Sequence, residues 1–154
     1  MQLSKLHRPH SRFTLCRTRT YLLNLAPVLV ALGLVWPFGG GHTVRMANTQ
    51  AAPAAAGVIH VGQDSNGNTK LQIKVKYLAQ PSSLTPARAN YVVWIQANGH
   101  EAKAQGVLKV GTDRSGTFEV VTPYSEFAIF VTAEDSPQPV APSGEKVLTA
   151  NIST

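Results

Sequence analysis

The stretch 69-TKLQIKVKYLA-79 decides the fold class of this chain, because apolar and polar residues alternate along it. The apolar positions fall on one face and are Leu71, Ile73, Val75 and Tyr77. The polar positions fall on the other face and are Lys70, Gln72, Lys74 and Lys76. Successive side chains of a β-strand point to opposite sides, so this period of two predicts a half-buried strand.

Similar short segments lie on both sides of that strand and are separated by turn signals such as Asn66-Gly67 and Asn98-Gly99. We expect further strands over 58–61, 91–97, 105–110, 118–122, 126–133 and 147–152. Seven short strands without a helix predict an all-β domain, an immunoglobulin-like β-sandwich. Segment 91–97 is apolar on both faces, as a central strand would be, and places Trp94 between the two sheets.

The N-terminal part of the chain reads as an export signal. Residues 1–20 are basic and contain no acid, and residues 21–38 are apolar apart from Asn24. A basic segment before an apolar one is typical of a signal peptide or of a transmembrane anchor helix, and both alternatives stay open. Either one predicts an exported protein, periplasmic or secreted, whose N-terminus begins in the cytoplasm.

Residues 39–57 are rich in Gly, Ala and Pro and show no apolar periodicity, so we expect a flexible linker there. The β-sandwich then occupies residues 58–154. The single cysteine, Cys16, precedes the apolar segment, so the exported part contains no disulfide. We expect this domain to be held together by its core alone.

The net charge of +6 belongs to the N-terminal segment and not to the domain. All eight acidic residues lie beyond Arg45, whereas six of the 14 basic residues lie at or before it. From Met46 onward the charges balance, so we expect no nucleic-acid binding.

An ordered series of motifs in 91–148 resembles a known family. Tyr91–Ile95 (YVVWI) resembles the Y-x-x-W-hydrophobic strand in the outer domain of anti-sigma-K factors, and Gly106–Leu108 resembles its following G-x-hydrophobic strand. Segment 130–139 (FVTAEDSPQP) is similar to that domain's V-T-x-E-P…S-P-Q-P-T ending, and Ser143-Gly144 before Val147-Leu148 fits its final segment. The core residues carried by the resemblance are Tyr91, Trp94, Gly106, Leu108, Phe130 and Thr132.

The resemblance implies a β-sandwich outside the membrane, acting as a sensor or accessory domain without catalytic residues. In that family a zinc-associated helical domain in the cytoplasm holds the sigma factor. Here the cytoplasmic part would be about twenty residues, too short for a helical domain. We therefore expect no sigma-factor capture by this chain itself.

The motifs of enzymes and metal sites are not seen. His60, His100, Asp64 and Glu101 lack the spacing of metal ligands, and no Gly-x-Ser-x-Gly occurs. We expect no catalytic, metal or cofactor site, no enzyme activity, and contact with another envelope protein. The alternative is a carbohydrate- or cell-wall-polymer-binding module, and burial of Trp94 would count against it. The candidate interaction surface consists of Lys70, Lys74, Lys76, Tyr124 and Glu134.

Overall fold

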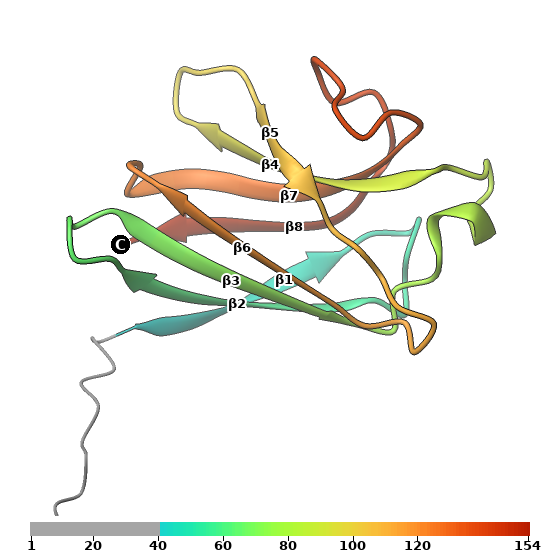
Figure 1. Cartoon of the computed structure of the whole chain (residues 1–154), viewed down its shortest axis with the longest axis horizontal. Helices are drawn as coiled ribbons and strands as arrows, with labels where there is room; N and C mark the ends of the chain where they lie inside the picture. The colour runs from blue at the N-terminus through green and yellow to red at the C-terminus, as the bar shows by residue number, and fades with distance from the viewer. Residues whose placement is uncertain (1–40) are drawn as a thin grey trace, which may run out of the picture. The chain divides into compact units, whose positions relative to one another are not determined.

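The computed structural model describes residues 41–154, which form an all-β structure (Figure 1). Its elements are β1 (His42–Asn48), β2 (Ala56–Gln63), β3 (Thr69–Lys76), the 3-10 turn η1 (Pro81–Ser83), β4 (Asn90–Ala97), β5 (Lys103–Val107), β6 (Gly116–Thr122), β7 (Glu126–Glu134) and β8 (Lys146–Ser153). All neighbouring strands are antiparallel, in the order β5-β4-β7-β8-β1-β2-β3-β6.

Strand β1 joins the two halves of the sheet and corrects two expectations. Its residues 42–46 pair with β2, and Ala47 and Asn48 pair with β8. Residues 41–154 therefore contain eight strands where seven were expected, and the expected linker 39–57 includes one of them. The segment HTVRMAN offers only Val44 and Met46 as large apolar residues, so its alternation is too short to recognise. Pairing with β2, the next strand along the chain, and with the distant strand β8 makes it a strand.

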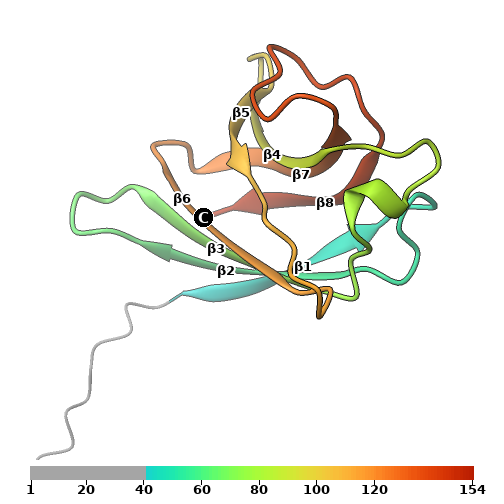
Figure 2. The same ribbon diagram turned by 45° about the vertical axis from the view of Figure 1, so that its right-hand side comes forward.

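The sheet nearly closes on itself, because its two end strands, β5 and β6, approach each other (Figure 2). A Cβ atom added at Gly106 in β5 would lie 3.2 Å from the ring of Phe118 in β6. Gly106 also has a backbone φ of 146°, a value that residues other than glycine rarely adopt. Strand β5 ends at Val107, earlier than residue 110, where the sequence predicted its end. The Leu108 amide still donates to the Tyr91 carbonyl at 2.8 Å.

The main core lies on the inner side of this sheet and follows the alternation of β3. Leu71, Ile73 and Val75 are buried, whereas Lys70 and the other lysines of β3 are exposed. Burial of each such aliphatic side chain contributes about 1.5–3 kcal/mol. Tyr77 departs from the expected face: β3 ends at Lys76, Tyr77 has a φ of 58°, and its side chain is 63% exposed. The left-handed backbone conformation of Tyr77 ends the alternation of inward and outward side chains.

Strand β4 is central, as its apolar sequence predicts, since it pairs with both β5 and β7. Tyr91, Val93 and Ile95 face the main core. Val92 and Trp94 face the opposite side and form a second cluster with Phe130 of β7. Trp94 is 0% exposed, but it does not lie in the main core between the halves of the sheet.

The expected signal peptide or anchor, at residues 21–38, lies outside the described residues, as does the basic segment 1–20. Residues 41–154 include no helix with the length and apolar character that crossing a membrane would require.

Candidate binding face

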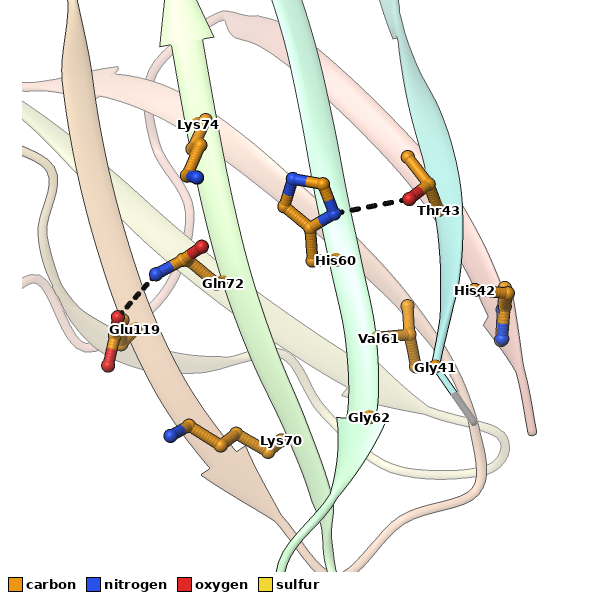
Figure 3. A pocket seen from close by; sticks show the side chains of 10 residues that line it. All are labelled: Gly41, His42, Thr43, His60, Val61, Gly62, Lys70, Gln72, Lys74 and Glu119. Atoms are coloured by element: carbon orange, nitrogen blue, oxygen red, sulfur yellow. Dashed lines mark hydrogen bonds between the residues drawn. The ribbon is translucent and has the colours of Figure 1, made fainter. Parts of the chain in front are cut away.

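Four polar side chains form a row across the outer side of strands β1, β2, β3 and β6 (Figure 3). In the strand register Thr43 is opposite His60, His60 is opposite Gln72, and Gln72 is opposite Glu119. We call these four residues the polar row. Residues that face each other across antiparallel strands share one side of the sheet. The row is therefore fixed by backbone pairing.

Two hydrogen bonds orient the polar row. The Thr43 hydroxyl lies 3.1 Å from Nδ1 of His60, and Nε2 of Gln72 donates to Oε1 of Glu119 at 2.6 Å. A hydroxyl beside an imidazole is also the first part of a nucleophile–base arrangement. The carboxylate of this face is bound to Gln72, however, and does not orient His60 as a triad acid would. The pair is best described as a cross-strand hydrogen bond.

Cations surround the polar row. Lys70, Lys74 and Lys76 project from β3, and Arg45 is in the same cross-strand row as Lys74, with Val58 between them. We call the outer side of β1, β2, β3 and β6 with these four cations the basic face. All four are exposed. In the part of the chain that the structure describes, the only ion pair joins Arg88 to Asp135, so none of these cations has an acidic partner.

The basic face contains a hollow of about 460 Å³, lined by the polar row together with Lys70 and Lys74 and by Gly62. Gly62 lies opposite Lys70 in the register, and a Cβ atom built at Gly62 would meet no atom within 4 Å. The missing side chain leaves this part of the sheet surface open. The hollow offers two cations, an imidazole, a hydroxyl, an amide and the one carboxylate of Glu119, a set in which cations outnumber acids and which suits an anionic or strongly hydrogen-bonding ligand.

Glu134 does not lie on the surface formed by the three lysines of β3, although it was predicted from the sequence to be part of the same candidate interaction surface. It is 1% exposed, so it is not part of an exposed interaction surface. Its Oε1 accepts hydrogen bonds from the Thr132 hydroxyl at 2.6 Å and from the amides of Ser143 and Gly144, each at 3.0 Å. Its Oε2 accepts one from the Ser143 hydroxyl at 2.5 Å. The carboxylate thereby anchors the Pro-rich segment that connects β7 to β8.

The hydrogen bonds of Glu134 connect to Trp94 through the hydroxyl of Thr132. Nε1 of Trp94 donates to the Thr132 hydroxyl oxygen at 2.8 Å, and that hydroxyl donates onward to Glu134. Burial alone would raise the pKa of Glu134, but the hydrogen bonds from Ser143, Thr132 and Gly144 together lower it below its ordinary value. The ring of Phe130 stacks on Trp94, with centroids 6.4 Å apart, and Nζ of Lys146 lies 4.3 Å from the centroid of the Phe130 ring.

The other residues singled out from the sequence lie elsewhere. Tyr124 is half-buried in the turn after β6, where its ring lies 5.9 Å from that of His100, and it does not line the hollow with the lysines. Leu108 is buried in the main core. The Tyr91 hydroxyl donates to the Ala79 carbonyl at 3.0 Å, and burial raises the pKa of Tyr91 to about 12.

Asp64 closes the hairpin turn between β2 and β3 and accepts hydrogen bonds from the side chain and backbone of Asn68 and from the backbone amide of Asn66. These bonds lower the pKa of Asp64. Among residues 41–154 no three His, Cys, Asp or Glu side chains converge as metal ligands would.

Sequence reasoning missed the polar row. The alternation of β3 places Gln72 beside the lysines, and the Asn66-Gly67 turn bears on which residue of β2 faces it, but the positions of Thr43 and Glu119 depend on the pairing of β1 and β6, which no local pattern encodes. Protein-family profiles do not match this sequence, and no curated protein is similar to it at a significant level.

Proposed function

We propose that this chain is an exported, non-catalytic β-sandwich of the bacterial envelope that acts by contact with another protein. The observation that carries the proposal is the basic face, where four strands hold exposed cations and a hydrogen-bonded polar row in fixed positions. The strand backbone that carries these side chains is already ordered, so binding of a partner costs conformational entropy in the side chains and not in the backbone. The N-terminal segment 1–38 supports the exported location and offers a membrane attachment if it is retained.

The finer fold within this proposal is an immunoglobulin-like sandwich similar to the outer domain of anti-sigma-K factors. Strands β5, β4, β7 and β8 form one layer, and β2, β3 and β6 form the other, with β1 shared between them. The main core is built from apolar residues of both layers, which supports a sandwich rather than an open sheet.

The burial of Trp94 favours protein contact over the alternative, a module that binds carbohydrate or cell-wall polymer. Glycan-binding sandwiches stack sugar rings on exposed aromatic side chains, and Trp94 is 0% exposed with its ring against Phe130. The polar row and the four cations of the basic face include no Tyr, Phe or Trp. The face is therefore suited to charged and hydrogen-bonding contacts.

Site-specific photo-crosslinking of the full-length protein in its native host tests the proposal. A photoreactive residue in place of Lys74 should yield a discrete protein adduct. The same residue in place of the exposed Asn151 of β8 serves as the matched control. Absence of a protein adduct at position 74, or identical adducts at both positions, would refute contact through this face.

A further inference from the structure

We propose that the basic face binds an extended acidic segment of the partner protein, lying along β3. This inference rests on the proposed function and names the chemistry of the partner. Three observations carry it: the uneven distribution of charge over the domain, the spacing of the cations, and the shape of the hollow.

The described part of the chain is electrically polarised. The basic face has four cations and one acid, whereas the rest of residues 41–154 has five Lys or Arg and seven Asp or Glu. The single acid of the face, Glu119, is already hydrogen-bonded to Gln72. A surface on which cations outnumber acids by four to one attracts a segment of negative charge and disfavours partners with a net positive charge.

The spacing of the cations matches that of an extended peptide. Lys74 and Lys76 are two residues apart in β3, about 6.6 Å from the rise of a strand, and Lys70 is four residues from Lys74, about 13 Å. A peptide in the same conformation with acids at alternate positions presents carboxylates on one side at the same period. Arg45 lies two strands from Lys74, about 9.6 Å away, and borders the same track.

The hollow favours a chain over a planar surface. A bilayer cannot follow the depression at Gly62, whereas a single peptide strand can lie in it between Lys70 and Lys74. The polar row lines the same hollow and offers hydrogen bonds to a peptide backbone. Val121, opposite Lys70 and 48% exposed, offers an apolar contact to the stem of a ligand side chain.

The test is binding of a fluorescein-labelled peptide of alternating Glu and Ser by full-length protein in nonionic detergent at low salt. Fluorescence anisotropy measures Kd, with a Gln–Ser peptide as the neutral control. The variant K70Q/K74Q removes two cations of the face, and K103Q/K109Q removes two exposed cations outside it. The first variant should raise Kd between about twofold and thirtyfold, from typical strengths of exposed ion pairs, and the second should change it by less than twofold.

Several outcomes decide between the possible partners. Equal weakening by both variants would show unspecific attraction and overturn the proposal. Binding to vesicles containing anionic lipid, or to a polyuronate, with no binding of the acidic peptide would overturn it in favour of those ligands. In either case a protein adduct at position 74 in the photo-crosslinking experiment would leave the proposed function standing, so the two failures are distinguishable. Circular dichroism of both variants checks that the fold is intact.

Discussion

Replacement of Glu134 by Ala is expected to detach the segment between β7 and β8 and to destabilise the whole domain. The carboxylate accepts four hydrogen bonds, from the Thr132 hydroxyl, the Ser143 amide, the Ser143 hydroxyl and the Gly144 amide. Alanine leaves all four donors without this acceptor. Ser143 lies at the surface, so water can hydrate part of this set once the segment moves away.

The magnitude follows from these bonds. A buried donor that loses its partner costs about 1–3 kcal/mol, and hydration of the exposed end of the set brings the expected loss for E134A to about 2–4 kcal/mol. E134Q separates geometry from charge. Three of the four donors form their hydrogen bond with Oε1, and the side-chain amide oxygen of Gln can occupy that position. Only charge assistance is then lost, and we expect a cost of about 0.5–1.5 kcal/mol.

Urea unfolding followed by circular dichroism measures both variants against the wild-type protein. A W36F background leaves Trp94 as the only tryptophan, so its fluorescence reports the hydrogen-bonded network locally. The reasoning is refuted if E134A unfolds within about 0.5 kcal/mol of the wild-type protein, the range of an ordinary surface substitution. It is also refuted if E134Q is as damaging as E134A.

Three further predictions follow from the same region and from the glycines. The pKa of Glu134 is lowered in the folded protein, so its contribution to stability is complete above the unfolded-state pKa and is lost as pH falls through the folded-state pKa. Urea unfolding measured between about pH 5 and pH 2 should therefore show that the free energy of unfolding falls less with decreasing pH for E134Q than for the wild-type protein. In the W36F background, acrylamide should quench Trp94 several-fold less in the folded protein than in urea, and equal quenching would contradict its burial. G144A should destabilise by about 2 kcal/mol or more, because its Cβ would overlap the Ala133 carbonyl oxygen, whereas G62A should stay within about 1 kcal/mol of wild type in thermal unfolding.

The sequence predicted most strands because their side chains alternate or are apolar throughout. The alternation of β3 and the two apolar faces of β4 are both found in the structure. Strand β1 was missed because HTVRMAN contains only two large apolar residues and is followed by an alanine-rich segment. Its pairing partners, β2 and β8, lie at opposite ends of the domain sequence, and no window along the chain includes all three.

The candidate site was predicted only in part. Lys70, Lys74 and Lys76 were placed on one exposed face by their spacing alone, and the structure leaves them there. Glu134 was included in the candidate interaction surface, yet it is buried, and two hydroxyls and two amides compensate its burial. Those donors come partly from nine and ten residues further along the chain and could not be anticipated from its neighbours.

The sequence by itself determined that the domain is all-β and which side of β3 carries the lysines, because a period of two is a local property of an extended backbone. Only the tertiary structure decided that β1 joins both halves of the sheet and that Trp94 packs outside the main core. It also decided that Thr43, His60, Gln72 and Glu119 share one row, since the row needs the registers of four strands at once, and Glu119 lies 47 residues beyond its partner Gln72.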